Sequence, residues 1–123
     1  MNKKLISLCL LLPLALGLVS CSSMVKTNQL QFGIQAAQKD LWDEAIFRWK
    51  KSAELNPASA AVYNNLAVAY EKKGRWEEAE KAYTMAIKLS PDNKYIKSNY
   101  KNYQERLETN EKEKLDKDKN EKK

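Results

Sequence analysis

The sequence YNNLAVAYEKKGRWEEAEKAYTMAIKLSP, residues 63–91, contains two stretches of helical periodicity separated by one break. Apolar residues recur three and four positions apart on both sides of the break, which is the spacing of one face of an α-helix. Gly74 lies at the break and Pro91 follows the second stretch, and both residue types are common just past helix ends. The segment therefore predicts two short helices. Their apolar stripes are Tyr63, Leu66, Ala67 and Tyr70, then Trp76, Ala79, Tyr83, Ala86 and Ile87.

The same pattern occurs once more, 34 residues earlier. A fixed period of this length is typical of proteins built from stacked helical hairpins. Small residues at matching positions would let helices approach closely, and large ones would fill the space between them. The matching pairs are Phe32 and Leu66, Gly33 and Ala67, Trp42 and Trp76, Ala45 and Ala79, Trp49 and Tyr83, Leu55 and Leu89, and Pro57 and Pro91. We expect Phe32, Trp42, Trp49, Tyr63, Leu66, Tyr70, Trp76 and Tyr83 to fill that space.

Residues 60–93 closely resemble the tetratricopeptide repeat, and residues 26–59 resemble it more loosely. The residues that carry the resemblance are Tyr63–Tyr70, Gly74–Ala79, Tyr83, Ala86, Leu89 and Pro91. The resemblance implies an all-α fold, a short α-solenoid of two helix-turn-helix repeats. A third apolar stripe with a solvated opposite face predicts a C-terminal capping helix over residues 94–107, which such arrays need for solubility. The sixteen residues 108–123 carry six basic and six acidic side chains, and we expect a disordered or weakly helical tail there.

The resemblance also implies a concave groove lined by the first helix of each pair. The lining positions are Thr27, Leu30, Gln31, Ile34 and Gln38, then Asn64, Asn65, Val68, Glu71 and Lys72, and finally Tyr95, Asn99, Asn102 and Arg106. Asn65 is the strongest candidate, because its amide can both donate to and accept from an extended peptide. The alternative is that Asn64 and Asn65 bond only within the fold. Some relatives hold a carboxylate terminus with groove lysines, but Leu30, Ile34 and Tyr95 stand at matching positions. The mixed surface suits an amphipathic helix or extended segment of a protein partner.

The N-terminus predicts a targeting segment. Two lysines precede a Leu-rich uncharged run, as in a secretory signal peptide. Its end, Leu18–Cys21, resembles the bacterial lipobox, which implies cleavage after residue 20 and attachment of lipid to Cys21. Residues 1–20 would be the signal peptide and 21–25 a lipid-anchored tether. The alternative is a retained membrane helix, because the uncharged run extends to residue 25.

Composition excludes several classes of function. The 123 residues contain no histidine, which excludes His-based catalysis and imidazole metal sites. Cys9 would leave with the signal peptide and Cys21 would carry lipid, so no thiol remains for a disulfide or a metal site. The formal charge of +6 falls to +4 for residues 21–123, with no basic arm for nucleic acid. We expect no enzyme activity, no cofactor and no bound metal.

These features predict a membrane-anchored lipoprotein of the bacterial envelope that binds another protein. Family resemblance suggests a scaffold or assembly factor for a pilus, secretion or outer-membrane complex. If the source has two membranes, the absence of Asp after Cys21 resembles outer-membrane sorting, with the domain in the periplasm. The alternatives are a spacer whose charged tail contacts cell wall or lipid, and a non-catalytic subunit of an enzyme complex. Two repeats are fewer than an independent array usually needs, so a homo-oligomer is a further possibility.

Overall fold

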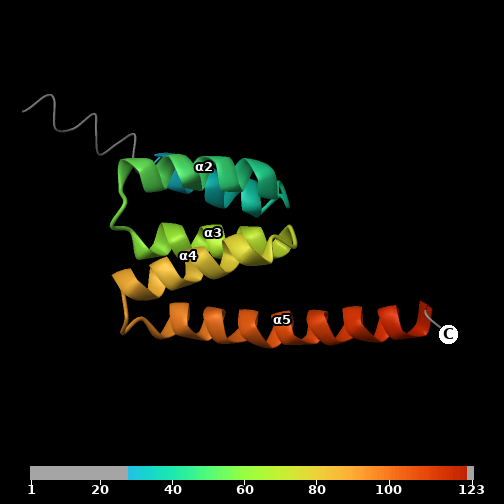
Figure 1. Ribbon diagram of the computed structural model, residues 1–123. Coiled ribbons are helices and arrows are strands. Elements are labelled where there is room, and N and C mark those ends of the chain that lie inside the picture. Colours follow the sequence, from blue (N-terminus) through green and yellow to red (C-terminus); the bar gives the residue numbers. More distant parts are fainter. Residues whose placement is uncertain (1–27, 122–123) are drawn as a thin grey trace, which may run out of the picture.

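The computed structural model describes residues 28–121, and every regular element in that range is an α-helix. A first helix over residues 28–37 precedes four others. These are α2 (Trp42–Leu55), α3 (Ala60–Lys72), α4 (Trp76–Leu89) and α5 (Lys94–Glu121). The layers follow chain order, from the first helix and α2 through α3 and α4 to α5 (Figure 1). The all-α solenoid predicted from the period of 34 is confirmed.

The turns inside the two hairpins have the same backbone conformation. Asp40 has a φ of 57° and Gly74 a φ of 67°, and the two positions are one period apart. The helices also end alike, since the Asn56 amide donates to the Ser52 carbonyl at 2.9 Å and the Ser90 amide to the Ala86 carbonyl at 3.0 Å. The break expected at Gly74 and the helix end expected before Pro91 are therefore confirmed, together with their counterparts one period earlier. Each repeat of the sequence pattern is also a repeat of the backbone.

Replacing Gly74 with alanine should lower the free energy of unfolding by about 1–2 kcal/mol, because a side chain in left-handed backbone costs about that much. No crowding adds to this cost, since a Cβ at Gly74 would lie 4.0 Å from the Trp76 indole nitrogen, which is ordinary contact. Asp40→Gly is the matched control and should leave stability unchanged or raise it. Urea denaturation of both variants checks the prediction. Equal midpoints for Gly74→Ala and the unchanged chain would contradict it.

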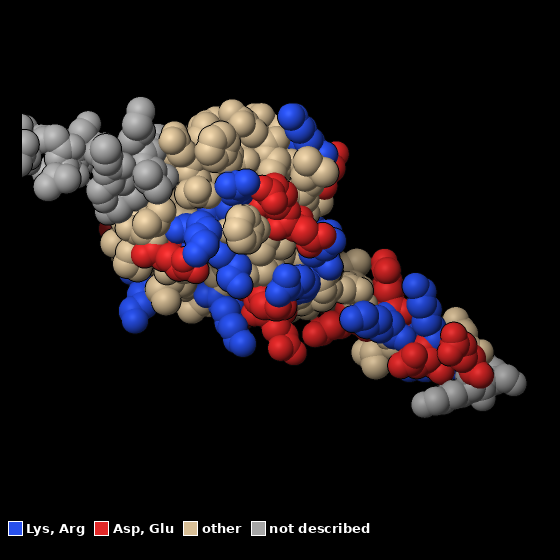
Figure 2. Space-filling model, turned by 90° about the horizontal axis from the view of Figure 1, so that it is seen from above, with Lys and Arg blue, Asp and Glu red and all other residues tan. Residues whose placement is uncertain are grey.

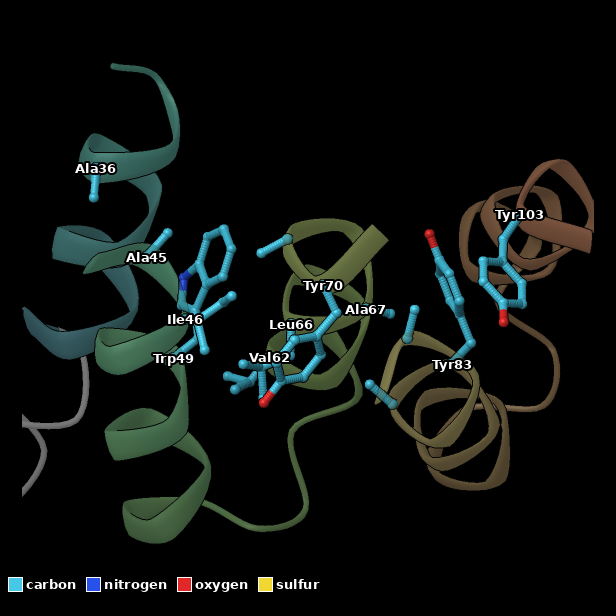
Figure 3. Packing of buried hydrophobic residues seen from close by; sticks show 13 residues of the cluster. Ala36, Ala45, Ile46, Trp49, Val62, Leu66, Ala67, Tyr70, Tyr83 and Tyr103 are labelled. Carbon is cyan, nitrogen blue, oxygen red and sulfur yellow. The ribbon is translucent and has the colours of Figure 1, made fainter. Parts of the chain in front are cut away.

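The core is built from small residues on helix faces and aromatic rings between them (Figure 3). Ala45, Ala67, Ala79 and Ala86 are all fully buried. Gly33 allows a similar close approach, because a methyl group there would collide with the Trp49 indole. The roles expected for the small residues are confirmed.

Phe32 was expected to fill space between helices, and that prediction is wrong. Its side chain is 46% exposed, and the Arg48 guanidinium lies 5.6 Å from its ring centroid. The matching residue in the second repeat, Leu66, is buried. The difference has a physical reason, since the described chain has a repeat to cover Leu66 but none before the first repeat to cover Phe32.

An aromatic seam joins α4 to α5. The Tyr83 and Tyr103 ring centroids lie 5.3 Å apart, and both side chains are buried. Tyr100 and Trp76 extend the seam with ring separations of 5.7–6.1 Å. The Tyr103 hydroxyl donates to the Trp76 carbonyl at 2.9 Å, which satisfies its polar end inside the core. This seam fixes α5 on the second repeat.

Burial raises the pKa of Tyr103 to about 12 from an ordinary 10.0, and the Glu80 carboxylate adds to the shift. The unfolded chain therefore loses this proton at lower pH than the folded one. The contribution of the seam to stability should be complete below pH 10 and should be lost as the pH rises from 10 towards 12. Thermal unfolding followed by circular dichroism across this window checks the prediction. The side chain at this position cannot ionise in the variant Tyr103→Phe, so the melting temperature of this variant should fall less between pH 10 and pH 12. An identical fall in both chains would show that Tyr103 is not the group responsible.

The capping helix does not end near residue 107, and the segment expected to be a disordered or weakly helical tail is helical over residues 108–121. α5 continues to Glu121 as a charged helix that projects past the stack (Figure 1). This segment lacks glycine and proline, and Glu108 and Glu113 each precede a lysine by four residues, a spacing that supports isolated helix. Within residues 28–121, no helix is both long and apolar enough to cross a membrane.

Candidate protein-binding groove

Three of the predicted groove residues are apolar and lie on the first helices of the two repeats, and we call them the apolar strip. Leu30 and Ile34 come from residues 28–37 and Val68 from α3, and all three are half-buried against the core. The position of the first helix is secured by the Trp49 indole nitrogen, which donates to the Leu30 carbonyl at 3.2 Å. The strip therefore leaves apolar surface partly accessible on both helices, and apolar surface of this kind can bind an amphipathic segment.

Two predicted groove amides meet between α3 and α5. The Asn99 side-chain nitrogen donates to the Asn64 side-chain oxygen at 3.0 Å, and both residues are half-buried. This pair brings the second repeat and the capping helix onto one surface. Asn64 therefore forms a hydrogen bond within the fold, which is what the alternative interpretation of Asn64 and Asn65 predicted for it. Each amide still keeps donor or acceptor capacity for a ligand, since one bond uses only part of it.

A buried carboxylate makes a second link between these helices. Glu71 has a side chain only 10% exposed, and its Oε1 lies 2.6 Å from Arg106 Nη2 on α5. The Tyr83 hydroxyl donates to Glu71 Oε2 at 3.3 Å. Burial, with the adjacent Glu71 carboxylate, raises the pKa of Tyr83 well above its usual range. Glu71 and Arg106 thus hold α5 in register.

The remaining predicted residues are distributed along the same helices. Asn65 is half-buried on α3, and Lys72 is exposed with its ammonium 5.9 Å from the Trp42 ring centroid. Gln31, Gln38, Tyr95 and Asn102 are exposed, and Tyr95 reaches 84%. Thr27 and Cys21 lie outside the described residues. The structure thus brings Asn64 to Asn99 and Glu71 to Arg106, and it places Lys72 against α2.

The sequence pattern does not predict a hollow whose lining differs from the predicted groove residues. An open hollow of about 510 Å³ lies between α2, α3 and α4. Its floor includes Tyr63, Leu66 and Tyr70, which the periodicity had assigned to the core, and Met85 contributes from α4. No sequence signal separates a core tyrosine from one that also lines a hollow.

The arrangement suits recognition. Among residues 28–121, no group of three or more Asp, Glu, His or Cys side chains is placed to hold a metal ion. The described side chains at the predicted groove positions offer apolar surface, amide groups and one ion pair, which are the kinds of contact that polypeptide recognition uses.

Comparison with known proteins agrees with this reading of the fold. Residues 60–93 match the family model described as "Tetratricopeptide repeat", and residues 37–74 match the one described as "TPR repeat". Among solved structures, the chain is similar to the Arabidopsis OM64 TPR domain, with a TM-score of 0.65 and 22% identity. The similarity covers 70% of this chain and 71% of that chain, and at 22% identity it supports only a shared fold.

A curated human protein, the protein O-mannosyl-transferase TMTC1, is 31% identical over 67 residues. The match covers 54% of this chain but 8% of that protein, so the chain spans less than a tenth of its length. The shared segment is on the scale of two repeats, and the name of the transferase carries no activity over to this chain. Stacks of such repeats present extended surfaces for other proteins. Within residues 37–93 this chain thus matches two family models of the tetratricopeptide repeat, a repeat that implies protein–protein interaction.

Proposed function

We propose that the chain is a lipid-anchored protein of the bacterial envelope whose repeats bind a segment of another protein. The apolar strip of Leu30, Ile34 and Val68 carries the binding part of this proposal. An amphipathic helix or extended strand laid along it would bury side chains on the strip. Its polar groups would meet Asn65 and the Asn64–Asn99 pair. We propose that such binding makes the chain a scaffold or assembly factor for an envelope complex.

The anchor is supported by the sequence before the described residues. The basic start, the apolar run and Leu18–Cys21 together have the organisation of a lipoprotein signal. Several acyl chains at one terminus hold a protein stably to a bilayer, because each buried methylene contributes about 0.8 kcal/mol. With serine after Cys21, the proposed location is the outer membrane facing the periplasm in a source with two membranes.

The groove is tested by replacing Asn65 and Val68 with alanine in a tagged full-length chain. Proteins that copurify from the native membrane are identified by mass spectrometry, and their recovery is compared with that of the unchanged chain. We expect about a tenfold loss, because 1.4 kcal/mol of lost binding energy corresponds to that factor. Lys88→Ala, at an exposed position of α4, is the control and should retain recovery. Undiminished recovery by a folded double variant would exclude the groove.

The anchor has a separate test. Metabolic labelling with a radioactive or clickable fatty acid should mark the full-length chain and should not mark Cys21→Ala. The same variant should accumulate the uncleaved precursor. Label that persists on Cys21→Ala would reject the lipobox interpretation.

The projecting part of α5 favours one second candidate, the spacer. Residues 111–121 are all exposed, and a helix rises about 1.5 Å per residue, so this segment reaches away from the stack. Deleting residues 111–123 distinguishes the candidates. The proposed scaffold keeps its partner after this deletion, whereas the spacer loses its contact with wall or lipid.

A further inference from the structure

Two half-exposed phenylalanine rings lie on the first helix and α2, the layer of the stack farthest from α5 (Figure 1). Phe32 and Phe47 are 46% and 52% exposed on the first helix and α2. The Arg48 guanidinium lies between them, 5.6 Å and 5.5 Å from the two ring centroids, and Glu44 pairs with it at 2.7 Å. We call Phe32, Phe47 and Arg48 the outer aromatic face. Figure 2 views the molecule from this end and shows uncharged side chains in the upper part of the view and Lys, Arg, Asp and Glu over its middle and lower parts.

This end differs from the other end of the stack. One period further along the chain, Phe32 corresponds to Leu66 and Arg48 to Ala82, and both of those residues are buried. At the positions of Phe32 and Arg48 the first repeat therefore presents to the outside what the second repeat buries. In contrast, Phe47 corresponds to Lys81, which is also exposed. Terminal repeats normally need a polar outer face. α5 provides a polar outer face at the C-terminal end of the stack, whereas the outer aromatic face exposes two phenylalanine rings at the other end.

The sequence before the described residues indicates that the outer aromatic face contacts the membrane. The uncharged run ends at Val25, three residues before the first described residue. An acyl chain on Cys21 would leave six residues before Asn28, a reach of at most about 20 Å. A retained membrane helix would leave fewer. Both readings of the N-terminus thus keep the first helix close to the bilayer.

We infer that the outer aromatic face docks on the lipid bilayer and sets the orientation of the stack. Exposed phenylalanines enter the interfacial region by burying apolar area, and an arginine beside them can donate to lipid phosphate. A weak intrinsic affinity is sufficient, because a short tether makes docking intramolecular. The inference rests on the membrane attachment proposed above. It adds that the groove helices are held in a fixed orientation to the membrane.

Site-directed spin labelling tests this docking. The full-length chain carrying Cys9→Ser is purified from bacterial membranes and placed in vesicles of phosphatidylethanolamine and phosphatidylglycerol. Gln35→Cys, one helical turn after Phe32, carries the label, and Ser98→Cys on α5 carries the control label. We expect several-fold higher access of oxygen, relative to an aqueous nickel chelate, at position 35 than at position 98.

The variant Phe32→Ser with Phe47→Ser should make the two positions alike, while the matched variant Tyr95→Ser with Leu115→Ser should not. Vesicle flotation is measured on the same samples. If the chain floats with the vesicles but the label at position 35 is as accessible to the nickel chelate as the label at position 98, the docking inference is wrong and the proposed anchor stands. If the chain does not float, both the docking inference and the proposed anchor are wrong. Spin–spin broadening between labels at position 35 would instead identify this face as a contact between two copies, which also overturns docking.

Discussion

A chain that ends at Asn93 should lose cooperative folding. Removing α5 removes the buried Ile96 and Tyr103 side chains and uncovers Tyr83, which is fully buried. Each large apolar side chain contributes about 1.5–3 kcal/mol when buried, against a total stability of about 5–15 kcal/mol for a small domain. Thermal melting followed by circular dichroism should change from a sigmoid to a gradual slope.

A chain that ends at Asn110 is the matched control. It keeps Leu107, which packs against the core, and it lacks only exposed residues of α5. Its melting temperature should stay close to that of the complete chain. A sigmoidal melt after truncation at Asn93 would show that two repeats are stable alone and that α5 is not their cap.

Replacing Tyr83 with alanine should destabilise the domain by about 3–5 kcal/mol, the range for removing a large aromatic ring from a core. The ring contacts Tyr100 and Tyr103, and its hydroxyl donates to the buried Glu71 carboxylate. One substitution therefore opens a cavity and removes a hydrogen bond from a buried charge. Urea denaturation measures the loss.

Tyr95→Ala provides the comparison, because the same atoms are removed from a side chain that is 84% exposed. Its midpoint should move by much less than that of Tyr83→Ala. Tyr83→Phe separates the two contributions, since it keeps the ring and removes only the hydroxyl. Equal midpoints for the two alanine variants would contradict the assignment of Tyr83 to the core.

The repeat architecture could be predicted because each hairpin repeats the same local requirements. A small residue must stand where helices approach, and a left-handed residue must end the first helix. Gly33 and Ala67 meet the first need, and Asp40 and Gly74 meet the second. These constraints act over one repeat, so the sequence pattern of a single period expresses them.

Features that depend on what lies beyond one repeat could not be predicted. Phe32 has the pattern of a core residue, yet it is exposed because the position is buried only when another repeat precedes it. Residues 108–121 have the balanced charge of a disordered tail, yet the Glu–Lys spacing and the preceding helix favour continued helix. The Asn64–Asn99 and Glu71–Arg106 contacts join residues 35 apart, and their partners could not be assigned from periodicity.

The residues at the predicted groove positions have a composition that suits a polypeptide partner. The apolar strip offers apolar surface that a partner can bury, and the Asn64 and Asn99 amides offer hydrogen bonds that can orient the partner. The fixed ion pair of Glu71 and Arg106 adds rigidity, which lowers the entropy lost on binding. The binding energy should therefore come from a few central contacts on α3.

Photo-crosslinking in the native membrane tests this central claim most directly. A benzoylphenylalanine placed at Asn65 of the full-length chain should form a covalent adduct with another protein on irradiation. The same probe at Lys88, on the second helix of the same repeat, should form none. Adducts from position 88 together with none from position 65 would show that partners bind elsewhere on the stack and would contradict the account.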